Sequence, residues 1–145
     1  MEEINIFEDE ALARLVEQSG IEPPADAVER ELQMMVAELD QQMKFRMGQD
    51  EMLALMQGGM KEKMEELKGD AYRIAKTDAV LKDYIRRGAF EISDEELERE
   101  ALAMSERLGM GIEVVRAFLG EDYGSLRYDL QVQRALSRIH EEWSA

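Results

Sequence analysis

The fold is decided by residues 60 to 87, which read MKEKMEELKGDAYRIAKTDAVLKDYIRR. Apolar side chains recur in this stretch at alternating steps of four and three residues, which is the heptad spacing of a helix with an apolar seam. The seam consists of Met60, Met64, Leu67, Ala71, Ile74, Leu81 and Ile85, with Asp78 as its one polar member. At 1.5 Å per residue the helix would be roughly 40 Å long, about the diameter of a compact globule of this chain length. We therefore expect an elongated molecule.

The preceding segment supplies a partner for this seam. A helix is predicted over residues 25–47, and its apolar residues have the same spacing, at Val28, Leu32, Met35, Leu39 and Met43. A short helix over residues 50–57 follows, and Gly58 and Gly59 end it before the long helix begins. Two long helices joined in this way predict an antiparallel helical hairpin over residues 25–87.

A second hairpin is predicted after a linker of residues 88–92, with a hinge near Phe90. Ser93 and Glu96 form a capping box, and Ile92 can pack on Leu97 as a hydrophobic staple, so a helix begins here. Gly109 is a plausible C′ residue for its end. A short helix over 112–119 and a last helix over about 125–143 complete the hairpin.

The whole chain is predicted to be one all-α domain, residues 1–145, because it is rich in helix-forming residues and lacks runs of alternating β-branched residues. Residues 1–24 form a lead-in, with a loose segment over 1–7, a short helix over 8–18 and an extended linker at Pro23 and Pro24.

The net charge argues against several classes of partner. The chain has 18 Lys and Arg against 33 Asp and Glu, a formal charge of -15. Binding to nucleic acid or to an anionic membrane surface is therefore not expected. There is no cysteine, no stretch of apolar residues long enough to span a membrane, and no export signal at the start. We expect a soluble, cytoplasmic protein.

No catalytic centre is apparent in the sequence. His140 is the one histidine, and without a second histidine or a cysteine the common metal and nucleophile arrangements are excluded. No phosphate-binding glycine loop occurs, and the acidic runs do not have the spacing of a calcium loop. We predict a protein that is not an enzyme and has no cofactor and no metal site.

Methionine is concentrated in the first hairpin. Eight of the 11 methionines lie there, at Met34, Met35, Met43, Met47, Met52, Met56, Met60 and Met64. Flexible thioether side chains suit a surface that adapts to many apolar partners. The alternative is that they fill the core between the two long helices, which we favour for Met35, Met43 and Met64. For Met47, Met52, Met56 and Met60 both interpretations stay open, because the end of a hairpin has little to pack against.

Two segments resemble the C-terminal domain of trigger factor. The first, Leu15 to Met35, reads LVEQSGIEPPADAVERELQMM, and the second, Ala71 to Glu100, reads AYRIAKTDAVLKDYIRRGAFEISDEELERE. The resemblance implies an all-helical domain whose two arms, residues 25–87 and 93–143, hold unfolded and nascent polypeptides without ATP. The family's ribosome-binding and prolyl isomerase domains have no counterpart in the sequence. Residues 45–48, Phe-Arg-Met-Gly, are similar to part of the ribosome-binding signature, but Gln49 and Asp50 follow, so no direct ribosome docking is expected.

We therefore predict an ATP-independent chaperone module that captures apolar segments of unfolded polypeptides. The side chains expected to bind them lie at the ends of the two hairpins: Phe45, Met47, Met52, Leu55, Met56 and Met60 in the first, and Val115, Phe118, Leu119 and Tyr123 in the second. One alternative is an adaptor or structural protein that forms a homodimer or docks one dedicated partner through the same residues. Another is a helical chaperone domain of the periplasmic SurA kind, which the missing export signal disfavours.

Overall fold

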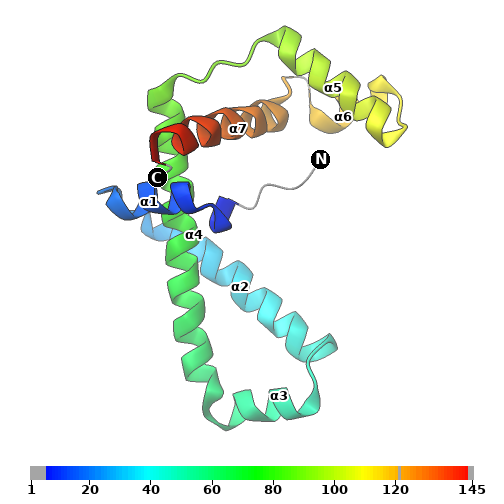
Figure 1. Ribbon diagram of the computed structural model, residues 1–145. Helices are drawn as coiled ribbons and strands as arrows, with labels where there is room; N and C mark the ends of the chain where they lie inside the picture. Colours follow the sequence, from blue (N-terminus) through cyan, green and yellow to red (C-terminus); the bar gives the residue numbers. More distant parts are fainter. Residues whose placement is uncertain (1–5, 121, 144–145) are drawn as a thin grey trace. The chain divides into compact units, whose positions relative to one another are not determined.

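The computed structural model describes residues 6–120 and 122–143, and every regular element in these residues is helical (Figure 1). The all-α prediction is therefore confirmed. The elements are η1 (Ile6–Glu8), α1 (Glu10–Gln18), α2 (Ala25–Phe45), α3 (Gln49–Ala54), η2 (Leu55–Gly59), α4 (Met60–Gly88), α5 (Asp94–Leu108), α6 (Ile112–Leu119) and α7 (Gly124–Trp143). Of the predicted loose segment over residues 1–7, residues 1–5 lie outside the described residues, and residues 6 and 7 belong to the short 3-10 helix η1.

The chain divides into two compact units. The first runs to Val80 and the second begins at Leu81, so the boundary lies inside α4. The sequence placed the division between the hairpins in the linker of residues 88–92 instead. The two units are described separately below.

In the first unit, α1 lies against α4, and both helices contribute buried residues to the core. Asp9 caps α1 by accepting a hydrogen bond from the backbone N–H of Leu12 at 2.9 Å. Leu12 is fully buried, and it lies with Thr77 of α4 along the contact between the two helices. The Tyr72 hydroxyl of α4 donates to Glu22 at 2.7 Å, which fixes the segment before the two prolines.

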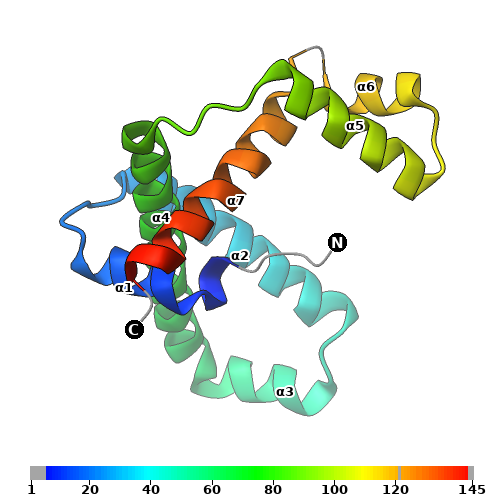
Figure 2. The same cartoon turned by 45° about the horizontal axis from the view of Figure 1, so that its top comes forward.

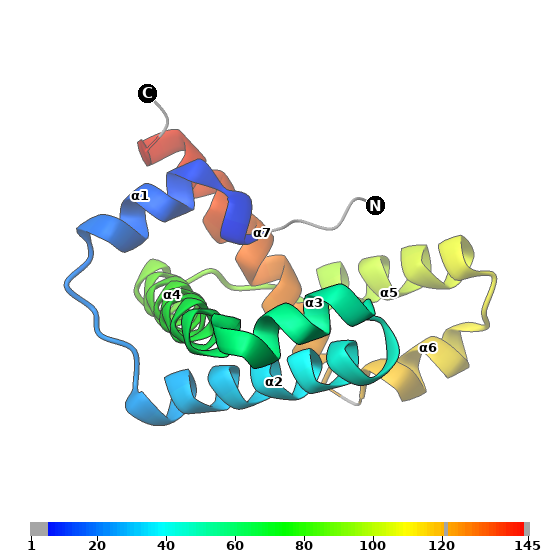
Figure 3. The same ribbon diagram turned by 90° about the horizontal axis from the view of Figure 1, so that it is seen from below.

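The first hairpin is present, but its two long helices diverge. Figure 1 shows α2 and α4 separating towards α3, and Figure 3 shows α3 running from the end of α4 towards the end of α2. Of the predicted seam residues in α2, Leu39 is buried and the others are only half-buried. The turn η2 bends at Gly58, whose φ of +138° favours glycine. The sequence predicted a break at this position, and the structure confirms it.

The second unit has its core where α5, α6 and the start of α7 meet (Figure 2). The Ser93 hydroxyl accepts from the backbone N–H of Glu96 at 3.2 Å, which confirms the predicted helix start. The predicted staple residues are both buried in this core, which comprises Ile92, Leu97, Ala101, Val115, Tyr123 and Leu126. Helix α5 ends at Gly109 in a left-handed conformation, φ +66°, as the sequence predicted.

The linker after α4 is fixed to α7 by three side chains on one face of that helix. Arg127 donates to the carbonyl of Ile92 at 3.0 Å, Gln131 to the carbonyl of Phe90 at 2.9 Å, and Arg134 to the carbonyl of Glu91 at 2.8 Å. We call Arg127, Gln131 and Arg134 the linker clamp. The sequence suggested a hinge near Phe90, whereas the structure ties this segment down.

The Phe90 ring anchors the same linker. It stacks on Tyr84, with ring centroids 5.9 Å apart, and the guanidinium of Arg138 lies 4.3 Å from its centroid. Gly88 lies so close to this ring that a Cβ atom there would be 2.3 Å from Phe90 Cε2. The packing of the Phe90 ring therefore favours glycine at position 88.

Candidate interaction surfaces

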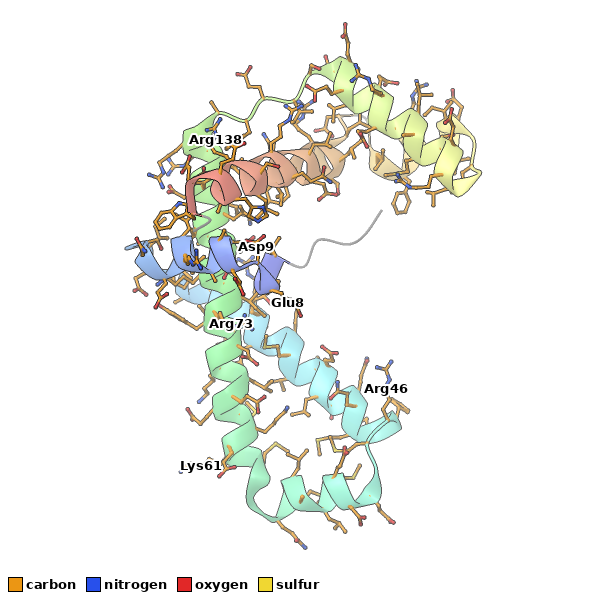
Figure 4. The ribbon with its side chains drawn as sticks, in the orientation of Figure 1. Glu8, Asp9, Arg46, Lys61, Arg73 and Arg138 are labelled. Atoms are coloured by element: carbon orange, nitrogen blue, oxygen red, sulfur yellow. The ribbon has the colours of Figure 1, made fainter. Side chains whose placement is uncertain are left out.

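The end of the first hairpin is largely exposed. We call residues 45–60 the first tip; they comprise the end of α2, α3, η2 and the first residue of α4. Neither α3 nor η2 has a buried residue. Figure 4 labels Arg46, near the start of the tip, and Lys61, the residue that directly follows it. A six-residue helix between two diverging helices has too few neighbours to bury its apolar side chains.

The predicted binding residues of the first tip are all at least partly accessible. Phe45 is 81% exposed and Met56 69% exposed, while the other four predicted residues, Met47, Met52, Leu55 and Met60, are half-buried. Leu53 is also exposed, although it is not among the binding residues predicted from the sequence. The sequence does indicate this exposure. Residues 52, 53, 55 and 56 are all apolar and cannot all lie on one face of a helix, so some of them must face solvent.

The end of the second hairpin divides into a buried and an exposed face. We call α6 and its flanking loops, residues 109–120 with 122 and 123, the second tip. Phe118 is 87% exposed and Val114 lies beside it on the same helix face, also exposed. Leu119 is half-buried. Two predicted binding residues, Val115 and Tyr123, belong instead to the core, at 3% and 9% exposure.

Tyr123 belongs to a polar network that joins three parts of the second unit. Its hydroxyl donates to Glu98 of α5 at 2.7 Å and accepts from Arg116 Nε of α6 at 3.1 Å. Arg116 also donates to the second oxygen of Glu98 at 2.9 Å. The Tyr123 hydroxyl and then the Arg116 guanidinium lower the pKa of the Glu98 carboxyl, and the hydrogen bond to Glu98 raises the pKa of Tyr123.

This network positions the exposed face of the second tip. It joins Glu98 of α5 to Arg116 of α6 and to Tyr123, the residue before α7. Arg116 directly follows the buried Val115 in α6. Every polar group in it has a partner of opposite charge or of matching hydrogen-bonding role. We interpret it as a structural device that holds α6 against α5, so that Phe118 stays outside.

The described residues offer no arrangement typical of metal chemistry. Within residues 6–120 and 122–143, no group of three or more His, Cys, Asp or Glu side chains is placed to hold a metal ion. In the same ranges no helix is long and apolar enough to span a lipid bilayer. The features that remain to be explained are the exposed apolar side chains of the two tips.

Comparison with known proteins identifies the family. The family model for the C-terminus of bacterial trigger factor protein matches residues 3–141. Among curated proteins, the trigger factor of Macrococcus caseolyticus is 27% identical over 139 residues, which cover 95% of this chain and 32% of the relative. The trigger factor of Bacillus subtilis is 26% identical over 137 residues, covering 92% and 31%. That of Carboxydothermus hydrogenoformans is 23% identical over 140 residues, covering 96% and 33%.

These matches agree with the resemblance found in the two sequence segments. The chain spans about a third of the length of the curated relatives it matches, 32% for the first of them. No solved structure matches the chain. Because the family model covers nearly the whole sequence, this chain belongs to the trigger factor C-terminal domain family.

Proposed function

We propose that the chain is an ATP-independent chaperone module that binds unfolded or nascent polypeptides through the exposed apolar side chains of its two tips. The observation that carries the proposal is the exposure of Phe45 and Phe118, at 81% and 87%. Large aromatic side chains of this kind dominate the energetics of interfaces. Their position at the tips, outside both cores, leaves them available to a partner without unfolding either unit.

The binding would be weak at each side chain and strengthened by number. Fully burying one Phe or Met side chain contributes about 1.5–3 kcal/mol, so a single contact holds a polypeptide only briefly. Several contacts engaged together multiply in effect, because each later contact is intramolecular. The half-buried methionines Met47, Met52 and Met60 can change rotamer to follow different partners.

The charge and the family support a soluble, cytoplasmic module that acts without cofactor or catalysis. A charge of -15 keeps a loaded module soluble and disfavours nucleic acid and membrane surfaces. Negative charge also disfavours docking to ribosomal RNA. Asp50 follows the one segment that is similar to a ribosome-binding signature, residues 45–48. We therefore do not include ribosome docking in the proposed function of this chain.

The test uses the methionines as reporters. The methyl groups are labelled with carbon-13, and the chain is titrated with a reduced and alkylated, permanently unfolded globular protein and separately with the native form of that protein. We expect shifts or line broadening at Met47, Met52, Met56 and Met60 with the unfolded form alone. If several unrelated unfolded proteins leave these methyl groups unchanged, the proposal fails for the first tip.

A matched pair of variants in α6 tests the second tip. Phe118→Ser removes an exposed side chain, and Val115→Ala removes methyl groups from the core three residues earlier. We expect Phe118→Ser to weaken binding about tenfold, equivalent to about 1.4 kcal/mol, with little change in thermal stability. Val115→Ala should lower stability and leave the affinity of the folded protein unchanged. The reverse pattern would contradict the assignment.

The alternative is an adaptor or structural protein that uses the same tips for a fixed contact. In that case the tips would bind a second copy of the chain or one folded partner. Sedimentation over a range of concentrations detects the second copy, and Phe118→Ser should then shift the dimer to monomer. A stable dimer that ignores unfolded polypeptides would replace the chaperone proposal with this alternative.

A further inference from the structure

The methionines of the structure differ widely in their access to solvent. Met56 of η2 is 69% exposed and Met34 of α2 is 59% exposed. Met52 and Met60 are half-buried, and Met104 packs against the core of the second unit. Because an oxidant in solution must reach the sulfur atom, Met56 and Met34 are the side chains that it attacks first in this series.

Met56 has a position at which oxidation changes the surface but not the core. The turn η2 contains no buried residue, so a bulkier, polar side chain at position 56 displaces no packed neighbour. Oxidation of a thioether converts a flexible apolar side chain into a polar one. At Met56 this places a polar group among the exposed apolar side chains of the first tip, which include Phe45 and Leu53.

We propose that Met56 is a site of reversible oxidation by peroxide, and that its sulfoxide weakens the capture of apolar polypeptide segments by the first tip. The inference rests on the proposed function of that tip. Methionine at this position would then allow both binding and its control by oxidation. A leucine in the same place would bind apolar segments but could not be oxidised.

The chemistry is a two-electron oxygen transfer. A lone pair of the Met56 sulfur attacks one oxygen of hydrogen peroxide and the O–O bond breaks. The second oxygen leaves as hydroxide and takes up the remaining proton to give water. Sulfur is oxidised by two electrons and the peroxide is reduced by two. Methionine sulfoxide reductases restore the thioether, so the change can be reversed without new synthesis of the protein.

The test compares the wild-type chain with two variants, each of which replaces one exposed methionine with leucine. Met56→Leu keeps the apolar surface and removes the oxidisable sulfur. Met34→Leu is the matched control, because Met34 is similarly exposed but lies on α2, outside the first tip. Each protein is treated with hydrogen peroxide, mapped by mass spectrometry, checked by urea unfolding, and titrated with the unfolded protein used above.

We expect oxidation to weaken binding by wild type and by Met34→Leu about fivefold, with the unfolding midpoint unchanged, while Met56→Leu retains its affinity. Treatment with methionine sulfoxide reductase should restore the affinity. If Met56→Leu loses as much affinity as wild type, or if oxidised wild type binds as well as the untreated protein, the inference is wrong. Failure of the untreated protein to bind is seen before peroxide is added, and it would instead overturn the proposed function and this inference with it.

Discussion

Replacing Gln131 with alanine should destabilise the second unit, because Gln131 is the central side chain of the linker clamp. Its amide donates to the carbonyl of Phe90 at 2.9 Å, across 41 residues of sequence. The side chain is half-buried and Phe90 is buried at 8% exposure. The substitution removes the donor and leaves the carbonyl in a poorly solvated position.

The magnitude follows from these two effects. An intramolecular hydrogen bond contributes about 1 kcal/mol, and a buried carbonyl left without any donor costs about 1–3 kcal/mol. A cleft lined by Ile85, Ala89, Phe90 and Gln131 runs beside the linker, so water can reach part of this carbonyl and reduce the second cost. We therefore expect Gln131→Ala to lower the free energy of unfolding of the second unit by about 1–2 kcal/mol.

The assay uses the one tryptophan of the chain. Trp143 is the last residue of α7, so its fluorescence during urea unfolding reports on the second unit. With a urea m-value of about 1 kcal/mol per molar, the midpoint should fall by about 1–2 M. Asp129→Ala, on an exposed position of the same helix, is the control and should change the free energy by less than about 0.5 kcal/mol.

A second substitution separates hydrogen bonding from packing. Gln131→Met keeps most of the side-chain volume and removes the donor, so it should lose nearly as much stability as Gln131→Ala. A Gln131→Met variant as stable as wild type would refute the reasoning, because it would show that the donor contributes nothing to holding the linker.

Substitutions at three further positions test the second unit. Gly88→Ala should destabilise it by about 1–3 kcal/mol in the same fluorescence assay, because the new Cβ would lie 2.3 Å from the Phe90 ring; an unchanged midpoint would mean that the ring moves at no cost. Ser93→Ala should cost about 1 kcal/mol through loss of the α5 cap, and Ser93→Asp should retain the stability. Glu98→Gln should lower the melting temperature near neutral pH but progressively less in acid. The reason is that the Tyr123 hydroxyl lowers the pKa of Glu98, so the stabilisation is complete above the ordinary pKa and is lost as the pH falls through the lowered one. A difference independent of pH would contradict this.

The helix boundaries of the second unit could be predicted because their chemistry is local. The cap at Ser93 and the left-handed glycine at Gly109 each involve residues within a few positions of one another. The linker clamp could not be predicted in the same way. Arg127, Gln131 and Arg134 look like solvent-facing residues of a helix, and their partners lie 35, 41 and 43 residues earlier. No spacing in the sequence indicates such pairs.

The divergence of α2 and α4 has a different reason. Heptad spacing predicts which face of a helix is apolar, but not whether a partner packs along its whole length. Packed helices have axes about 8–10 Å apart. Here the six residues of α3 alone span about 9 Å, and three residues before α3 and the five of η2 add to the separation. The connecting segment therefore holds the ends of the two helices too far apart for close packing, so seam residues such as Met35 and Met64 remain half-buried.

Both tips follow from the same physical constraint. A helix of six or eight residues at the end of a hairpin has a neighbour on one side only, yet α3 and α6 each carry apolar residues on more than one face. In α6, Ile112, Val115 and Leu119 share the face that is turned to the core, and Val114 and Phe118 share a neighbouring face that has nothing to cover it. The sequence pattern predicts an interaction site in such a helix, because the helix has more apolar surface than its position can bury. Which of its residues are exposed depends on the side from which the core approaches, and this is why Val115 and Phe118, three residues apart, differ so widely in exposure.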